Sequence, residues 1–362
     1  MINVTKPFLP PKEEYQKYID EIWKRNWLTN NGPLVNELEL KLKQTLKLKH
    51  LLYVSNGTTA LQIAIKALEL TGEIITTPFS YVATTSSIVW EGCTPVFVDI
   101  DKNTLNINPK LIEQAITPNT SAILATHVFG NPCDIEAIDA IAKKHDLKVI
   151  YDAAHCYATR YKGESVLNYG DISCISFHAT KLFHTTEGGA VVTQSPELLE
   201  KLAYLRNFGH NGPYEFKGVG INGKNSEFHA AMGLCNLKYS EQIVAKRKQD
   251  SLLYDQWLKK LDIQRPTINA LSDYNYAYYP IIFKSEAECL AVLESLQQKN
   301  IYARRYFYPS LSTLNYVAKS QCKVSESIAS RILCLPLYYD LSQSEIDMIC
   351  RYIKRYFQYK PA

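Results

Sequence analysis

Three separate stretches of the sequence carry residue types that a group-transfer site could use. The first, "SNGTTAL" (55–61), ends a predicted strand and begins a predicted helix. A helix N-terminus offers unpaired N–H groups and the positive end of the helix dipole, so it binds anions and most often phosphate. An ordinary Ser, Asn or Thr helix cap has the same pattern, so this stretch alone leaves both interpretations open.

The second stretch, "VIYDAAH" (149–155), places Asp152 at the carboxyl end of an apolar strand. Ligands of open α/β sheets bind at this edge. A carboxylate there can pair with a cationic ring nitrogen, but it can also cap a helix or form a buried ion pair. Asp152 alone does not decide between these roles.

The third stretch, "SFHATKLFHTTEGG" (176–189), places Lys181 shortly after an apolar strand. Removal from water disfavours the charged form of a lysine, which lowers its pKa and makes its amine a nucleophile toward carbonyls. Ser176 could add a hydroxyl to a phosphate site. A solvated surface lysine is the alternative when this stretch is taken alone.

The order of these three stretches predicts pyridoxal phosphate chemistry. The phosphate site anchors the cofactor, Asp152 keeps the pyridine nitrogen protonated, and Lys181 forms the Schiff base. An aromatic ring should stack on the cofactor. Tyr81 is a candidate, because it lies shortly after the end of the strand predicted at 73–77. Ordinary packing is the alternative for Tyr81.

Alternating apolar runs and helical patterns must position these residues. Strands are predicted at 51–55, 73–77, 95–100, 122–129, 148–154, 172–177 and 189–193, with helices at 58–70, 81–92, 109–116 and 134–145 between them. Runs this apolar indicate strands covered on both faces. We therefore expect an α/β fold, with a mostly parallel central sheet and helices on both faces.

The pattern changes after about residue 235. Helices are predicted at 239–261, 285–300 and 342–357, with a strand at 276–283 and many of the 25 tyrosines among them. This pattern is typical of a smaller α+β domain. We expect a large cofactor-binding domain over 1–235 and a small C-terminal domain over 236–362.

Composition argues against several other classes of protein. The net charge of +4, from 40 basic and 36 acidic residues, is too even to favour nucleic acid or an anionic membrane as a partner. Nine cysteines are scattered with no CxxC and no metal-ligand spacing. The N-terminus has no apolar signal region, and no stretch approaches the roughly 20 apolar residues of a membrane span. We expect a cytoplasmic protein without a metal.

Six motifs, in order along nearly the whole chain, resemble the DegT/StrS-type family of sugar-nucleotide aminotransferases. They are "WLTNNGP" (27–33), "SNGTTAL" (55–61), "TPFSYVATTSSIVWEGCTPVFVDID" (77–101), "DAAHCYA" (152–158), "SFHATK…EGGAVVT" (176–193) and "GINGKNSEFHAAMG" (220–233). The resemblance implies a fold-type I enzyme with pyridoxal phosphate as cofactor. It also implies L-glutamate as amino donor, a nucleotide-linked ketosugar as acceptor, and a homodimer with the active site at its interface.

The resemblance also implies roles for individual residues. Lys181 would be the Schiff-base lysine, Asp152 the partner of the pyridinium, His155 the neighbour of the ring hydroxyl, and Tyr81 the stacking ring. Gly57, Thr58 and Ser176 would hold the phosphate, with Asn222 reaching it from the second subunit. Substrate contacts are implied for Thr29, Asn31, His178 and Glu187. The stretch "RRYFYP" (304–309) resembles a substrate-contacting segment, and Asn225 stands where the family often has Met.

The motif around the lysine favours one position on the sugar. Members acting at C4 commonly read "SFH..K" before "EGG", whereas members acting at C3 more often read "SFYP.K" and "GD.G". His178 and the 187–189 stretch therefore favour C4 of the sugar. The resemblance implies a dTDP-linked 4-keto-6-deoxyglucose as the acceptor, and it suggests a deoxysugar for a surface polysaccharide such as the O-antigen of lipopolysaccharide. A C3 ketosugar or a UDP-linked 4-ketosugar remains an alternative. Lys181 argues against the related 3-dehydrases, where a histidine replaces the lysine.

Two rival interpretations come from other functional classes. "GVGING" (218–223) is a literal GxGxxG, but no buried strand precedes it and it follows the predicted sheet, so it does not fit a dinucleotide fingerprint. A non-enzymatic regulator on the same fold is the other rival. The intact Lys181 and Asp152 argue against it.

Overall fold

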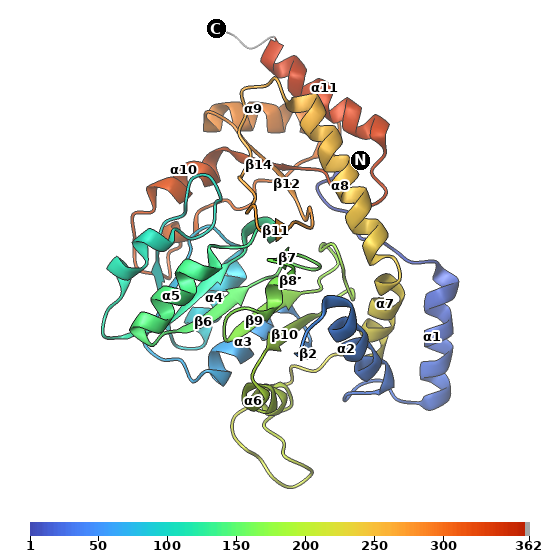
Figure 1. Ribbon diagram of the computed structural model, residues 1–362. Helices are drawn as coiled ribbons and strands as arrows, with labels where there is room; N and C mark the ends of the chain where they lie inside the picture. Colours follow the sequence, from blue (N-terminus) through green and yellow to red (C-terminus); the bar gives the residue numbers. More distant parts are fainter. Residues whose placement is uncertain (359–362) are drawn as a thin grey trace.

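The computed structural model describes residues 1–358 and is built around a seven-stranded sheet (Figure 1). The strand order is β2 (His50–Val54), β10 (Gly189–Thr193), β9 (Ile172–Ser176), β6 (Lys148–Asp152), β5 (Thr120–Thr126), β3 (Glu73–Thr76) and β4 (Thr94–Phe97). Strand β10 runs antiparallel to its neighbours β2 and β9, and the other neighbouring pairs are parallel. The prediction of a mostly parallel α/β sheet is confirmed.

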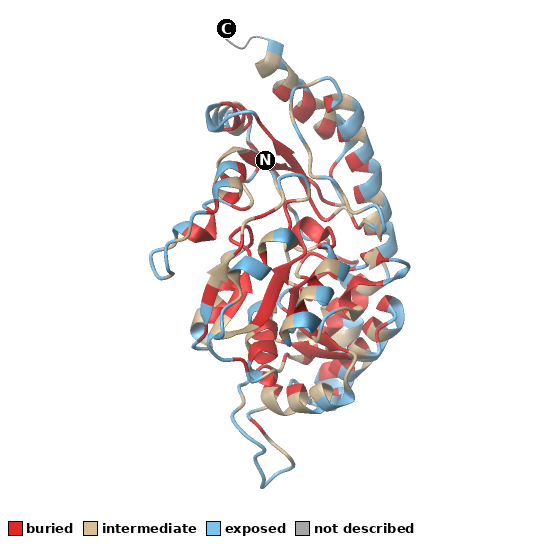
Figure 2. Ribbon diagram, turned by 60° about the vertical axis from the view of Figure 1, so that its left-hand side comes forward, coloured by how far each residue is buried: buried red, intermediate tan, exposed pale blue. Residues whose placement is uncertain are grey.

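Both faces of this sheet are buried, because successive side chains of a strand point to opposite faces. In β6, Val149 and Tyr151 enter one hydrophobic core and Ile150 enters the other. The first core includes α2 (Pro33–Leu46), α5 (Ile135–His145) and α7 (Glu227–Leu237), and the second includes α3 (Gly57–Ala67), α4 (Val82–Trp90) and α6 (Pro196–Arg206). Figure 2 shows the strands as buried ribbons among these helices. Burial on both sides explains why the strands are apolar at consecutive positions.

A further hydrophobic core lies in the C-terminal part of the chain. It joins α8 (Ser240–Leu258), α9 (Glu286–Gln297) and α11 (Gln343–Gln358) to the antiparallel pair β12 (Tyr279–Ile282) and β14 (Ile332–Leu335). The N-terminal strand β1 (Ile2–Asn3) joins this part by pairing with β13 (Ile301–Tyr302). We propose a domain boundary near residue 235, with β1 added to the smaller unit. The last residues of the predicted domain, 359–362, lie outside the described residues.

Smaller elements complete the two parts. Helix α1 (Lys12–Arg25) packs against α7, and α10 (Lys323–Arg331) packs against α9. A small sheet consists of β11 (Ser272–Asp273), β7 (Arg160–Tyr161) and β8 (Glu164–Ser165). In the described part of the chain, no helix combines the length and apolarity needed to cross a membrane.

The predicted helix at 109–116 is wrong. This segment forms two short 3₁₀ turns, Pro109–Leu111 and Glu113–Ala115. Pro118 disfavours helical backbone at Thr117, and the few residues before it are too short to sustain an α-helix. The "GVGING" segment (218–223) lies in the long loop between α6 and α7 at the bottom of Figure 1, not at a turn from strand to helix.

Candidate active site

A cavity of about 460 Å³ lies at the carboxyl edge of the sheet. Its walls come from the loops after β2, β3, β6 and β9, from the end of β5, and from the C-terminal segment around 304–307. The strands of this edge run in one direction, so their carboxyl ends bring residues from distant parts of the sequence together. Nine of the predicted residues line this cavity: Gly57, Thr58, Tyr81, Asp152, His155, Ser176, His178, Lys181 and Glu187.

The first turn of α3 forms an anion cradle on one side of the cavity. The Asn56 side chain caps the helix by accepting a hydrogen bond from the Thr59 N–H at 2.8 Å. A Cβ on Gly57 would lie 3.0 Å from Cβ of Ser176, which is tighter than ordinary contact. Glycine therefore allows the Ser176 hydroxyl to lie against the N-terminus of α3. These N–H and O–H donors suit a phosphate group.

Asp152 ends β6 and is buried at the floor of the cavity, with 5% of its surface exposed. Its Oδ2 accepts a hydrogen bond from the Thr84 hydroxyl at 2.6 Å, and its Oδ1 accepts one from the Ala154 N–H at 3.1 Å. Burial raises the pKa of the carboxyl, while these two donors and the charge of Lys181 oppose that rise. The site thus holds a buried carboxylate that a cationic ring nitrogen would stabilise.

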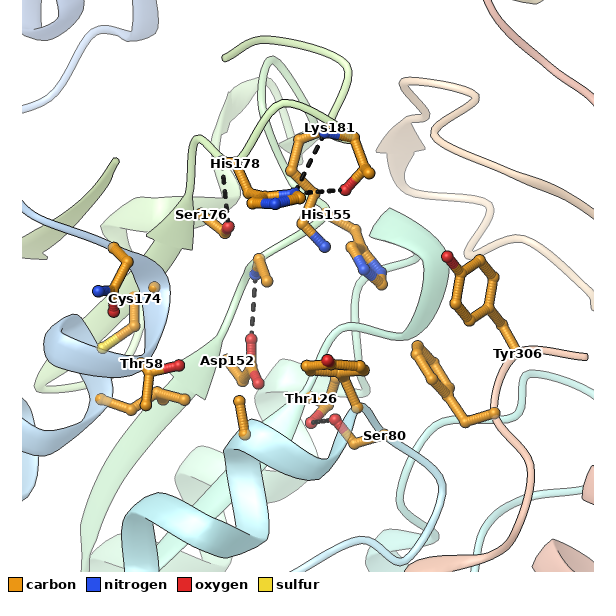
Figure 3. Close-up of a pocket in the computed structure, with 18 of the residues that line it drawn as sticks. Thr58, Ser80, Thr126, Asp152, His155, Cys174, Ser176, His178, Lys181 and Tyr306 are labelled. Carbon is orange, nitrogen blue, oxygen red and sulfur yellow. Dashed lines mark hydrogen bonds between the residues drawn. The ribbon is translucent and has the colours of Figure 1, made fainter. Parts of the chain in front are cut away.

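Lys181 projects into the same cavity from the loop after β9 (Figure 3). Burial lowers the pKa of its amine to about 8, and the negative charge of Asp152 opposes this shift. A substantial fraction of the amine is therefore neutral near physiological pH. A neutral buried amine is the form that bonds to an aldehyde.

His155 lies close to Lys181 in Figure 3. Its ring lies between aromatic side chains, with the Phe307 ring parallel at 5.9 Å and the Tyr278 ring at 4.8 Å. Burial lowers the pKa of the imidazole well below its ordinary value, so the ring is neutral. Its Nδ1 is buried and has no hydrogen-bond partner among the described residues. A buried orphan nitrogen in a cavity wall indicates that the cavity holds a polar group.

His178 and Glu187 lie at the partly exposed mouth of the cavity, with His178 Nε2 3.4 Å from Oε1 of Glu187. The Thr180 N–H donates to Nδ1 of His178 at 3.2 Å. A ring nitrogen that accepts a hydrogen bond carries no proton, so the proton lies on Nε2 and points toward Glu187. The pair can therefore offer both a donor and an acceptor to a sugar.

Three predicted residues do not line the cavity: Thr29, Asn31 and Asn222. The first two lie in the connection between α1 and α2. Asn222 is exposed in the α6–α7 loop, where its Oδ1 accepts a hydrogen bond from Nζ of Lys224 at 2.9 Å. The cavity of one chain is therefore assembled without these side chains.

Sequence reasoning missed several residues around the cavity. Arg304, Tyr306 and Phe307 line it, and the "RRYFYP" resemblance indicated the segment but not these individual residues.

Sequence reasoning noted that Asn225 stands where the family often has Met, but it did not predict the contacts of this residue. Asn225 is buried and donates to the Tyr53 hydroxyl at 3.0 Å and to the Glu187 carbonyl at 2.9 Å. The local packing accommodates a polar side chain because each donor has a partner.

The cavity fits pyridoxal phosphate. The cradle of Gly57 and Ser176 suits the phosphate, Asp152 suits the ring nitrogen, and the amine of Lys181 suits the aldehyde. The orphan Nδ1 of His155 can meet a polar substituent of the ring. Among the described residues, no group of three or more acidic, His or Cys side chains could hold a metal ion.

Comparisons with known proteins agree with this site. A model of the DegT/DnrJ/EryC1/StrS aminotransferase family matches residues 11–354. The chain is 44% identical to a dTDP-4-amino-4,6-dideoxy-D-glucose transaminase of Shigella dysenteriae over 98% of both chains. It is 40% identical to a transaminase of the same name from Escherichia coli, over 97% of both chains.

Solved structures give the same result for the fold. The crystal structure of DesI in the presence of its TDP-sugar product superposes with a TM-score of 0.93 at 30% identity, covering 98% of this chain and 92% of that one. The family match, these relatives and the fitted cavity together establish that the chain belongs to the DegT/DnrJ/EryC1/StrS aminotransferase family, whose members depend on pyridoxal phosphate.

Proposed function

We propose that the protein transfers the amino group of L-glutamate to C4 of dTDP-4-keto-6-deoxyglucose, giving dTDP-4-amino-4,6-dideoxyglucose. The observation that carries this proposal is the 44% identity, over 98% of both chains, with a transaminase named for that product. The "SFH..K" and "EGG" residues support C4 because family members that act at C4 commonly carry them, and His178 and Glu187 of these motifs lie together at the mouth of the cavity. A C3 ketosugar and a UDP-linked 4-ketosugar are the alternatives that the assay below separates.

Pyridoxal phosphate, when bound, supplies an aldehyde that bonds to amines and a protonated ring that withdraws electrons from the attached carbon. We assign Gly57, Thr58 and Ser176 to its phosphate, and Asp152 to its ring nitrogen. Tyr81 would cover the ring from the exposed side, since it caps α4 at the edge of the cavity.

Lys181 and His155 complete the cofactor site. Nδ1 of His155 would meet the ring hydroxyl, which gives this orphan nitrogen a partner. Nζ of Lys181 holds the cofactor between turnovers. When Lys181 is displaced from the cofactor, its free Nζ accepts and returns the proton that the amino-group transfer requires. Its pKa of about 8 suits both tasks near neutral pH.

The substrate would enter past the C-terminal segment. Arg304 is exposed at the cavity and suits the diphosphate of a nucleotide sugar, because guanidinium groups bind phosphate oxygens. Tyr306 stands beside it, with the Arg304 guanidinium carbon 4.9 Å from the Tyr306 ring centroid. Thr29 and Asn31 stay predicted substrate contacts.

We further propose a homodimer with a shared active site. The α6–α7 loop exposes large apolar side chains, including Tyr214 at 92%, Phe216 at 64% and Val219 at 74%. Exposed apolar clusters commonly mark interfaces, and soluble oligomers are mostly symmetric dimers. Docking of this loop on a second copy would bring Asn222 toward the partner's phosphate cradle.

We also propose that the protein acts in the cytoplasm. All nine cysteines are free and buried, which suits the reducing cytoplasm. A role in O-antigen or other surface polysaccharide synthesis rests on the family resemblance alone.

To test this function, the purified protein is incubated with pyridoxal phosphate, L-glutamate and dTDP-4-keto-6-deoxyglucose, and the sugar product is identified by NMR. We expect an equatorial amine at C4, with 2-oxoglutarate formed in equal amount. Parallel reactions contain the UDP-linked 4-ketosugar and a dTDP-linked 3-ketosugar. Faster turnover of either alternative would overturn the substrate assignment, whereas failure of every ketosugar to accept an amine would overturn the function.

A further inference from the structure

Three hydroxyl side chains form a continuous line of hydrogen bonds that ends at Asp152. Thr126 Oγ1 donates to Ser80 Oγ at 3.0 Å, Ser80 Oγ lies 2.7 Å from Thr84 Oγ1, and Thr84 Oγ1 donates to Oδ2 of Asp152 at 2.6 Å. All four residues are buried, with exposed fractions from 0% to 5%. They come from the end of β5, the loop after β3, helix α4 and the end of β6. Figure 3 shows the Thr126–Ser80 bond beside Asp152.

The direction of these bonds follows from the chemistry of a hydroxyl, which has one proton to donate. Because Thr84 gives its proton to Asp152, Ser80 must donate to Thr84. Thr126 in turn donates to Ser80. Every O–H dipole of this hydroxyl chain therefore points its positive end toward the carboxylate. Aligned hydrogen bonds polarise one another in a medium of low dielectric constant and strengthen the last bond of the series.

Asp152 needs such support because burial raises the pKa of its carboxyl. The side chains that face it are Lys181 from the loop after β9, Cys174 from β9, and His155 and Cys156 from the turn after β6. Burial raises the pKa of both thiols, and the histidine is neutral. Lys181 is thus the one cation among these neighbours, and its pKa of about 8 leaves part of the amine neutral near physiological pH. The hydroxyl chain stabilises the carboxylate whether or not this amine carries a charge.

We propose that Thr84, Ser80 and Thr126 are positioning residues that keep Asp152 ionised and oriented toward the cofactor ring. This inference rests on the proposed role of Asp152. Ser80 and Thr126 also line the cavity, so a direct contact with the cofactor is the competing explanation for them. The two explanations differ in their dependence on pH. Loss of the hydroxyl chain weakens binding only where Asp152 gains a proton, whereas loss of a direct contact weakens it at every pH.

The experiment measures the dissociation constant of pyridoxamine phosphate across the range from about pH 5 to 9. This probe has an amine in place of the aldehyde, so it does not bond to Lys181. In the wild-type protein, affinity should fall on the acid side as Asp152 becomes protonated. In Thr84→Val this fall should begin roughly one to two pH units higher, since a hydrogen bond to a charged group is lost. Ser80→Ala should shift it in the same direction by less.

Matched variants make the result decisive. Thr85 follows Thr84 in the same helix and is equally buried, but its hydroxyl has no partner among the described residues, so Thr85→Val should leave the profile unchanged. Thr84→Ser keeps the hydroxyl and should retain the wild-type profile. An unshifted Thr84→Val profile, or an equal loss at every pH, overturns the inference. If Thr84→Val does not fold, Ser80→Ala decides in the same way.

Asp152→Asn separates this inference from the function on which it rests. We expect weak binding with no acid-side transition from residue 152, because the amide cannot ionise. If Asp152→Asn binds the probe as the wild type does, the role of Asp152 itself is wrong. If Asp152→Asn changes the profile and Thr84→Val does not, only the hydroxyl chain is refuted.

Discussion

Lys181 and Asp152 face one buried cavity, and the charge of each residue opposes the shift that burial causes in the pKa of the other. The charge of Asp152 raises the pKa of Lys181, which burial lowers to about 8. The charge of Lys181 lowers the pKa of Asp152, which burial raises. Burial is the larger effect in both cases. The pair therefore combines an amine that can be neutral near pH 8 with a carboxylate that depends on neighbouring donors to stay ionised.

Attachment of the cofactor should depend on pH through Lys181. Only the neutral amine bonds to the aldehyde, so the attachment rate should rise about tenfold per pH unit at low pH and level off above about pH 8. Stopped-flow absorbance of the cofactor-free protein mixed with pyridoxal phosphate measures this rate. Asp152→Asn removes the negative charge that raises the pKa of Lys181, so the midpoint of the rate profile of this variant should move to lower pH. A wild-type midpoint as high as that of a free lysine would refute the role of burial.

Lys181→Ala should remove the visible absorbance of the lysine-bound cofactor and lower turnover by at least about 10³-fold, since nucleophile and proton carrier are lost together. The phosphate cradle is untouched, so pyridoxamine phosphate should still bind. Lys201→Ala is the control, because this lysine pairs with Glu69 on the surface. An active Lys181→Ala enzyme is incompatible with the proposed chemistry.

The parallel sheet was predictable because its strands are apolar on both faces, a pattern that solvent-exposed strands cannot have. Asp152 and Ser176 were predictable for a related reason. Each is the polar residue at which an apolar strand ends, and parallel strands gather such ends at one edge. The helix predicted at 109–116 was wrong because helical periodicity does not register that Pro118 ends any helix before Thr117, which leaves a segment too short to sustain an α-helix.

The hydroxyl chain could not be predicted in the same way. Ser80, Thr84 and Thr126 belong to common residue types, and their alignment depends on how α4 sits on β5 and β6. The same limit applies to Asn225, whose partners Tyr53 and Glu187 come from distant segments. Hydrogen bonds between distant segments leave no periodic signal in a sequence. Departures from a family motif, such as Asn225, are a partial substitute.

Asn225→Ala should lower the free energy of unfolding by about 1–2 kcal/mol, because a buried hydrogen-bonded amide is lost. Denaturant titration measures the change. A double-mutant cycle with Tyr53→Phe isolates the contact, and we expect a coupling of at least about 0.5 kcal/mol. Additive effects of the two substitutions would show that the 3.0 Å contact contributes nothing to stability.

Mixing Lys181→Ala with Asn222→Ala should test the shared active site, because we expect each substitution to lower activity in its own dimer. If Asn222 serves the partner's site, one of the two sites in a mixed dimer is complete. The Asn222→Ala subunit supplies its Lys181, and the Lys181→Ala subunit supplies its Asn222. Random exchange makes about half of the dimers mixed, so roughly a quarter of the wild-type activity should return. Lys181→Ala mixed with Asp152→Asn is the control, because both residues line the cavity of the same chain and no mixed site has both intact. Recovery only in the first mixture supports the shared site. Exchange without recovery, verified by native mass spectrometry, means that Asn222 does not act across the interface.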